Sequence, residues 1–320
     1  MTDVLRTPDE RFLDLPGFPH DPVYIDELKG FEGLRMHYVD EGPRNAGSIF
    51  LCLHGEPTWN YLYRRMIPVF KAAGHRVVAP DSFGFGRSDK PADEAVYTFD
   101  FHRKALVSFI RYLNLKNITL VCQDWGGILG LTLPMEMTDR FSRLLIMNTT
   151  LGTGDVQLTQ GFLDWRAWVA RNPDLSAGRL LKRTCPHLSD GEAAAYDAPF
   201  PDINYKAGVR HFPEIVPDRP DAPGAELSRR AREWLRSRWT GLVFMAVGTR
   251  DPVLGPPVMQ ALRRDIRGCP EPYEVAEAGH LVPEWGEEIA RRALDAFDST
   301  SGSGWGHSNY LGFTDSRQVT

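Results

Sequence analysis

The chain has few cysteines, no cluster of basic side chains and no long apolar run. Only four cysteines occur in 320 residues, and they show neither metal-ligand spacing nor a disulfide framework: Cys52, Cys122, Cys185 and Cys269. A formal net charge of −5 without a basic cluster gives no reason to expect a nucleic-acid or membrane partner. No stretch approaches the roughly 18 apolar residues of a membrane span, and the N-terminus has no apolar leader core. These absences predict a cytoplasmic protein.

Apolar strand-like runs alternate with amphipathic segments along most of the chain. The clearest buried strands are predicted at residues 49–53, 77–80, 118–122, 144–148 and 242–248. Between 101 and 113, apolar side chains fall on one helical stripe, and further helices are expected at 126–137, 226–239 and 287–297. This alternation predicts an α/β protein with a mostly parallel sheet and helices on both faces.

The most informative segment is the strand-to-turn sequence from Thr119 to Gly127. It reads Thr-Leu-Val-Cys-Gln-Asp-Trp-Gly-Gly, so Asp124 occupies the turn, and the small residues near it are Cys122 before and Gly126 and Gly127 after. A nucleophile elbow needs small neighbours, because its strained turn leaves no room for bulk. Asp124 is therefore a candidate nucleophile, and a helix N-cap is the alternative.

A carboxylate at this position limits the kind of electrophile that the protein can attack productively. A serine that attacked a saturated carbon would leave an ether that water cannot cleave, whereas a carboxylate leaves an ester that water hydrolyses. If Asp124 is the nucleophile, the electrophile is an alkyl carbon.

A second loop, His54-Gly55-Glu56-Pro57-Thr58-Trp59, follows the predicted strand at 49–53. Glycine and proline force an abrupt turn there, and such a loop can aim backbone N–H groups at a reacting oxygen. We expect the oxyanion hole to consist of the backbone N–H groups of Glu56 and Trp125.

The other members of a catalytic triad are expected in the order nucleophile, acid, histidine. Asp251 follows the apolar run 242–248, and His280 follows the shorter strand 273–276. Asp251 would orient the imidazole of His280, which would deprotonate water. Read singly, Asp251 is a good turn residue beside a proline and His280 an ordinary loop histidine. All three falling at strand ends in the right order favours the triad.

These motifs identify a resemblance to the haloalkane dehalogenases of the α/β-hydrolase superfamily. It spans nearly the whole chain and rests on residues 54–59, 81–91, 123–127, 198–201 and 278–280. It implies an eight-stranded, mostly parallel sheet with an inserted helical cap, and hydrolysis of a haloalkane to alcohol, halide and proton through an alkyl-aspartate ester. The substrate would be a small halogenated alkane, and no metal or organic cofactor is expected.

A departing halide needs hydrogen-bond donors that do not release their own proton to it, and indole N–H groups meet this need. Trp125 is one candidate. In the subfamily that the chain resembles, the second tryptophan comes from a Gly-Phe-x-x-Trp segment of the early cap, and residues 161–165 match it, which points to Trp165. Trp168 lies one helical turn further on and is interpreted as a packing residue.

Two other functions stay open at this stage. An epoxide hydrolase shares the aspartate elbow but needs cap tyrosines as acids, and Tyr196 and Tyr205 lie in the cap segment. A non-catalytic ligand receptor is the other alternative, since fold does not fix function.

The expected organisation is a core domain of residues 1–153 and 224–298, a helical cap of residues 154–223 and a disordered tail of residues 299–320. Phe162, Ile128 and Leu281 are expected in the substrate pocket. The last two are aliphatic where related enzymes often carry phenylalanine. We expect a monomer.

Overall fold

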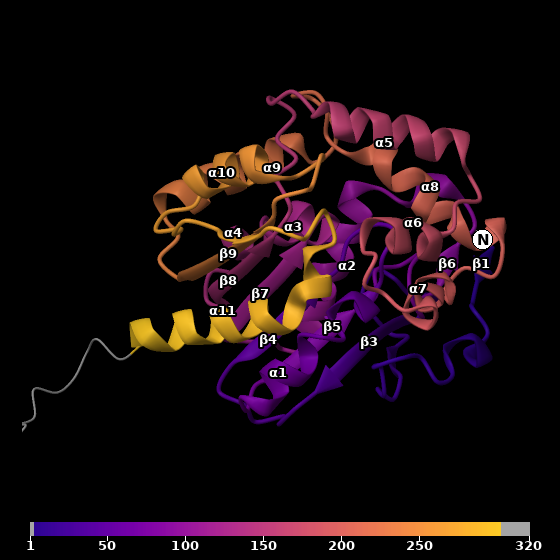
Figure 1. Ribbon diagram of the computed structural model, residues 1–320, viewed down its shortest axis with the longest axis horizontal. Coiled ribbons are helices and arrows are strands. Elements are labelled where there is room, and N and C mark those ends of the chain that lie inside the picture. The colour runs from indigo at the N-terminus through magenta and orange to yellow at the C-terminus, as the bar shows by residue number, and fades with distance from the viewer. Residues whose placement is uncertain (1–2, 302–320) are drawn as a thin grey trace, which may run out of the picture.

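An eight-stranded sheet organises the chain in the computed structural model, which describes residues 3–301 (Figure 1). The strands run in the order β10-β9-β8-β7-β4-β5-β3-β2. Their bounds are β2 Val23–Ile25, β3 Met36–Glu41, β4 Ile49–Leu53, β5 Arg76–Pro80, β7 Ile118–Gln123, β8 Phe141–Met147, β9 Leu242–Gly248 and β10 Tyr273–Val275. A separate antiparallel pair joins β1 (Val4–Leu5) to β6 (Lys90–Pro91).

The sheet is parallel from β10 to β5, and only β2 and β3 run antiparallel to their neighbours. In the centre, Leu53 at the end of β4 pairs with Cys122 near the end of β7. The loops that leave these two strands therefore begin side by side, at the edge where open α/β sheets bind ligands.

Strict alternation along the strands divides the core into two layers. In β4, Leu51 and Leu53 face one hydrophobic cluster while Phe50 and Cys52 face the other. The first cluster includes side chains of α2 (Phe99–Tyr112), α3 (Trp125–Gly130), α4 (Leu133–Glu136), α9 (Ala225–Ser237) and α10 (Pro256–Arg264). The second includes those of α1 (Ile67–Ala72) and α11 (Gly286–Ser301). Helices thus cover both faces, as the sequence predicts.

The predicted cap segment, residues 154–223, contains helices and loops but no strand. These are α5 (Gln160–Arg171), α6 (Ala177–Thr184), α7 (Asp190–Asp197) and α8 (Ala207–His211), with the short 3-10 helices η4 (Ile203–Lys206) and η5 (Phe212–Ile215). The remaining 3-10 helices are η1 (Asp9–Phe12), η2 (Asn60–Tyr63), η3 (Glu94–Val96) and η6 (Val282–Trp285). Figure 1 shows α5 to α8 gathered at one end of the sheet.

Two predicted helices differ from the structure. The single helix expected at 126–137 is two helices, because Pro134 lies in the first turn of α4 and could not continue α3. The last helix, expected to end at Phe297, runs to Ser301, since the first helix-breaking residue after it is Gly302. The start of the predicted tail, at residue 299, is therefore wrong, and residues 302–320 lie outside the described residues.

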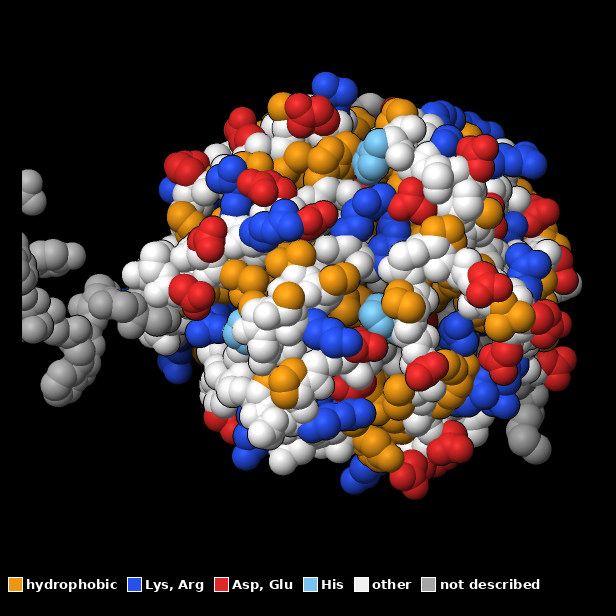
Figure 2. All heavy atoms as spheres, turned by 60° about the horizontal axis from the view of Figure 1, so that its bottom comes forward, with side chains coloured by type: hydrophobic (Ala, Val, Ile, Leu, Met, Phe, Trp, Pro, Cys, Tyr) orange, Lys and Arg blue, Asp and Glu red, His pale blue; other side chains and the backbone are white. Residues whose placement is uncertain are grey.

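On the face shown in Figure 2, acidic and basic side chains are interspersed between hydrophobic ones. None of the helices within residues 3–301 is long and apolar enough to cross a membrane.

Candidate active site

Asp124 lies on a sharp turn between β7 and α3. Its backbone has φ 51° and ψ −126°, which is a strained combination for a residue with a side chain. The turn is tight because α3 starts directly against β4: a β-carbon on Gly126 would lie 1.9 Å from the carbonyl oxygen of Leu53. This is the backbone that the sequence predicts for a nucleophile elbow.

The side chain of Asp124 does not cap the helix that it precedes. Its Oδ1 instead accepts a hydrogen bond of 2.8 Å from the backbone N–H of Glu56. The hydroxyl of Thr149 donates a hydrogen bond of 2.6 Å to the backbone carbonyl oxygen of Asp124 and so stabilises the turn. The alternative interpretation of Asp124 as a side-chain N-cap is therefore excluded.

The sequence predicts two backbone donors for an oxyanion hole, the N–H groups of Glu56 and Trp125. Glu56 N–H already points at Oδ1. Trp125 is the first residue of α3, so its N–H has no acceptor within the helix. An oxygen that gains negative charge at this position is thus placed near a helix N-terminus, where the dipole favours it.

His280 lies between two carboxylates. Its Nε2 is 3.5 Å from Asp124 Oδ2, and its Nδ1 is 2.9 Å from Asp251 Oδ2. Asp251 is held in turn by the side-chain amide of Asn148 at 2.8 Å and by the Val253 N–H at 2.8 Å. The structure therefore brings the three predicted triad residues together in one chain of contacts.

These carboxylates also set the charge of the imidazole. Burial lowers the pKa of His280, but the charges of Asp251 and Asp124 outweigh burial and raise this pKa well above its usual value. For Asp251, burial raises the pKa, while His280 and the hydrogen bonds to the carboxylate lower it below its usual value. In the resting protein the favoured form is an imidazolium between two carboxylates.

The Glu56 side chain is the unusual group of the site. Only 6% of the residue is exposed, and within residues 3–301 its Oε1 has no hydrogen-bond partner. Burial, followed by the negative charge of Asp124, raises the pKa of Glu56 well above its usual value, although His280 and the Trp165 indole oppose this. The carboxyl group is thus favoured in its neutral form beside the nucleophile.

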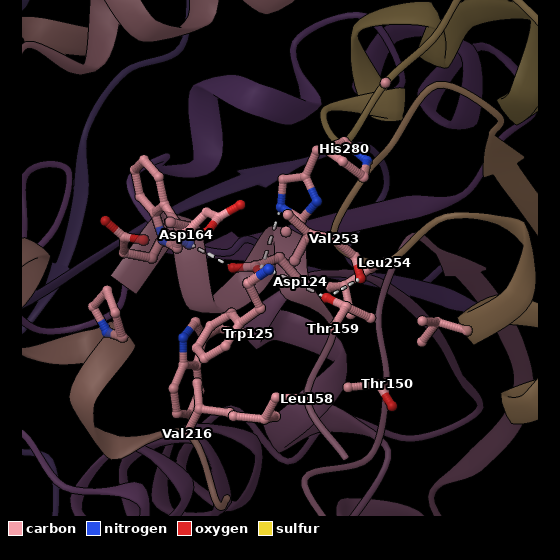
Figure 3. A pocket seen from close by; sticks show the side chains of 18 of the residues that line it. Asp124, Trp125, Thr150, Leu158, Thr159, Asp164, Val216, Val253, Leu254 and His280 are labelled. Carbon is pink, nitrogen blue, oxygen red and sulfur yellow. Dashed lines mark hydrogen bonds and ion pairs between the residues drawn. The ribbon is translucent and has the colours of Figure 1, made fainter. Parts of the chain in front are cut away.

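A cavity of about 790 Å³ opens above Asp124, between the sheet edge and the predicted cap. Figure 3 shows Asp124 and His280 facing each other, with Trp125, Leu158 and Val216 around them. Phe162, Ile128 and Leu281, the predicted pocket residues, all line this cavity. Most of the wall is apolar, as is usual for a small-molecule site.

Three tryptophans line the cavity: Trp125, Trp165 and Trp168. Trp125 packs edge-to-face against Phe212 of η5, with ring centroids 4.9 Å apart. Trp165 and Trp168 stack on each other on α5, with centroids 5.5 Å apart. Trp165 is close enough to Glu56 to lower the pKa of that carboxyl in part. Trp168 therefore packs as predicted, but it also reaches the cavity, which the sequence does not predict.

The two cap tyrosines lie elsewhere. Tyr196 is fully buried, and its hydroxyl donates a hydrogen bond to Glu284. Neither Tyr196 nor Tyr205 lines the cavity, and no tyrosine does within the part of the chain that the structure describes. Among the described residues, the cavity thus has no tyrosine hydroxyl that could protonate an epoxide oxygen.

Sequence reasoning missed two supporting residues, Asn148 and Thr149. They follow β8 directly, and a polar pair at the carboxyl end of a buried strand is the signal that was available. Asn148 joins Asp251 to the backbone, because the side-chain amide oxygen Oδ1 of Asn148 accepts a hydrogen bond of 2.8 Å from the Gly248 N–H. Among residues 3–301, no three His, Cys, Asp or Glu side chains converge on a point that would hold a metal ion.

Comparisons with known proteins identify the family of the chain. The family model of the α/β-hydrolase fold matches residues 48–287. A curated haloalkane dehalogenase of Psychrobacter cryohalolentis is 46% identical over 295 residues, which cover 90% of this chain and 96% of that protein. Haloalkane dehalogenase 1 of Mycobacterium tuberculosis is 45% identical over 295 residues and covers 91% of this chain and 98% of the relative.

Solved structures give the same picture. The haloalkane dehalogenase of Paraglaciecola agarilytica superimposes with a TM-score of 0.91 and 52% identity, over 92% of this chain and 99% of the other. That protein is described as tetrameric. A dehalogenase of Bradyrhizobium elkani has a TM-score of 0.74 at 24% identity and covers 89% of this chain and 99% of its own, which supports the fold.

Proposed function

This chain belongs to the haloalkane dehalogenases of the α/β-hydrolase fold family, and on that premise we propose that it hydrolyses small haloalkanes through an ester on Asp124. The observation that carries the proposal is the position of the Asp124 carboxylate. One oxygen faces the Glu56 N–H and the other faces His280, beneath an apolar cavity that tryptophans line.

The first step is a displacement at carbon. An Asp124 carboxylate oxygen attacks the halogen-bearing carbon, the carbon–halogen bond breaks, and the halide leaves with the bonding electrons. Trp125 and Trp165 are proposed to receive the halide through their indole N–H groups, which donate but cannot act as acids at neutral pH. Trp168 stacks on Trp165 and so helps to hold its ring.

The second step cleaves the ester with water. Water attacks the Asp124 carboxyl carbon while His280 Nε2 accepts a proton, and the resulting oxyanion is stabilised by the N–H groups of Glu56 and Trp125. Collapse of this intermediate breaks the bond to the alkoxide, which takes the second proton of the water from the new carboxyl group and leaves as the alcohol. Asp124 thereby returns to its carboxylate form, and His280 keeps the first proton. Asp251 keeps the imidazole in the required orientation throughout.

The two steps are linked through the charge of His280. In the resting site, Asp251 and Asp124 together raise the pKa of this imidazole. Ester formation removes the charge of Asp124, so the pKa of His280 falls and the imidazolium releases its proton to solvent. The neutral base is thereby formed only after the nucleophile has reacted, which accounts for the proton among the products.

The neutral Glu56 carboxyl group gives a further part of the proposal. Two observations support a role in ester hydrolysis: its Oε1 has no hydrogen-bond partner among the described residues, and its pKa is influenced by the nearby Asp124 and His280. We assign it the positioning of the attacking water.

Bromide release from 1,2-dibromoethane by the purified protein tests the function, with Asp124→Asn as the matched control. The proposal expects bromide from the natural protein and none from the variant. No bromide from a folded sample would contradict it. Styrene oxide then tests epoxide opening, which is not expected because no tyrosine among residues 3–301 lines the cavity.

A further inference from the structure

A buried ionic cluster adjoins the loop that carries His280. Its members are Arg64, Arg65, Glu192, Tyr196 and Glu284. Glu284 is four residues after His280 and belongs to η6. Its two carboxylate oxygens accept hydrogen bonds of 2.7 Å each from the two Nη atoms of Arg64. The Arg64 and Glu284 side chains are 2% and 0% exposed. Two parallel hydrogen bonds of this kind fix geometry as well as charge.

The same cluster reaches into helix α7 of the cap. The hydroxyl of Tyr196 donates to Glu284, and Arg64 Nη2 donates to Glu192 at 3.0 Å. Arg65 bridges the two carboxylates, at 2.5 Å from Glu192 and 3.3 Å from Glu284. Burial raises the pKa of Glu192, but the hydrogen bonds from the Ser189 N–H and from Arg64, together with the charges of Arg64 and Arg65, lower it to about 2. The cluster therefore joins η6, the segment that carries Arg64 and cap helix α7 through direct hydrogen bonds.

The cluster also connects to the catalytic loop by short paths. The Glu284 N–H donates to the Leu281 carbonyl at 3.0 Å, which closes the turn directly after His280. On the other side of the histidine, the Gln123 side chain donates to the His280 carbonyl at 3.0 Å. His280 is thus held between an anchor on β7 and an anchor on Glu284.

We propose that Arg64, Glu284 and Tyr196 are positioning residues for His280, which hold its loop in the geometry that ester hydrolysis needs and tie cap helix α7 to it. This inference rests on the proposed function. The nucleophile is fixed independently, because Asp124 is held by the Glu56 N–H and by Thr149. Loosening the cluster is therefore expected to slow the second step and to leave the first step unchanged.

The test separates the two steps. Rapid mixing with 1,2-dibromoethane gives the first burst of bromide, which reports ester formation, and the later steady rate reports hydrolysis. Intact-protein mass spectrometry gives the fraction of enzyme that carries the ester. Tyr196→Phe removes one hydroxyl and leaves the charges paired, so it is the variant that keeps the fold. Glu284→Gln removes the central charge.

Asp40→Asn is the matched control. Asp40 accepts two hydrogen bonds from Arg76, at 2.8 and 2.7 Å, and its side chain is 0% exposed. This pair joins β3 to β5, and neither residue lines the cavity. The control therefore removes an equally buried carboxylate at a place remote from His280.

We expect Tyr196→Phe to slow ester hydrolysis about tenfold, since a displaced catalytic group loses rate steeply with distance. The ester then accumulates while the burst rate is unchanged, and Glu284→Gln has a larger effect if it folds. The inference is overturned if both phases are unchanged in Tyr196→Phe, if both fall together, or if Asp40→Asn accumulates ester equally. A natural protein that releases no bromide at all contradicts the proposed function instead.

Discussion

Gly55 and Asp124 are packed so closely that no side chain fits between them. A β-carbon on Gly55 would lie 2.2 Å from Asp124 Oδ1. The loop that supplies the Glu56 N–H can approach the carboxylate only because this position is glycine. The contact joins the loop of residues 54–59 to the turn that carries Asp124.

Gly55→Ala should therefore abolish most of the activity. The methyl group must push the Asp124 carboxylate out of line, and the added bulk should destabilise the fold by about 1–3 kcal/mol. Bromide release and thermal melting measure the two effects. Gly47→Ala is the control, because a β-carbon there has no atom within 4 Å. A fully active Gly55→Ala variant would contradict the geometry.

The two stacked tryptophans should differ in their importance. We expect Trp165→Phe to slow bromide release about a hundredfold, as for the loss of one donor to a developing charge, and to weaken halide binding as followed by fluorescence quenching. Trp168→Phe keeps a ring to stack on Trp165 and should have a small effect. If the effects are reversed, Trp168 is the halide donor.

Glu56→Gln should stabilise the protein at neutral and higher pH while it slows ester hydrolysis. Burial first, and then Asp124, raise the pKa of Glu56 far above the ordinary value of 4.5. The folded state thus binds more protons than the unfolded state, and the natural protein loses stability as pH rises above that ordinary value. Glutamine cannot ionise, so the gain in melting temperature over the natural protein should grow between about pH 5 and pH 8. A constant or shrinking difference would show that Glu56 is not neutral.

Lowering the pH should slow ester hydrolysis before it slows ester formation. Ester formation needs only the Asp124 carboxylate, whereas hydrolysis needs His280 without its proton. Lowering the pH should therefore reduce the steady rate of bromide release before it reduces the first burst. Rapid-mixing measurements across pH check this order. If the burst fails first, His280 is not the base of the second step.

Much of the site could be predicted because its residues stand at strand ends. Asp124, Asp251 and His280 each follow an apolar run, and parallel strands bring such ends to one edge of the sheet. The split of the predicted helix at 126–137 depends on Pro134, a local signal that the apolar pattern obscured. These elements required only short-range information.

Other features depend on contacts that no local pattern shows. Arg64 and Glu284 are 220 positions apart, and each reads as an ordinary charged residue until the fold pairs them. The neutral state of Glu56 arises from burial and from Asp124, neither of which is visible in the loop sequence. Trp168 likewise lines the cavity because of the way α5 is placed in the fold, which the sequence of the helix does not show.

A covalent ester on Asp124 can be detected directly in the variant His280→Gln. This variant, which is expected to form the ester but not to hydrolyse it, is incubated with 1,2-dibromoethane, digested and analysed by mass spectrometry. The account predicts a bromoethyl group on the peptide that contains Asp124, and none in the double variant with Asp124→Asn. An unmodified Asp124 in His280→Gln, with bromide release by the natural protein intact, would contradict the account.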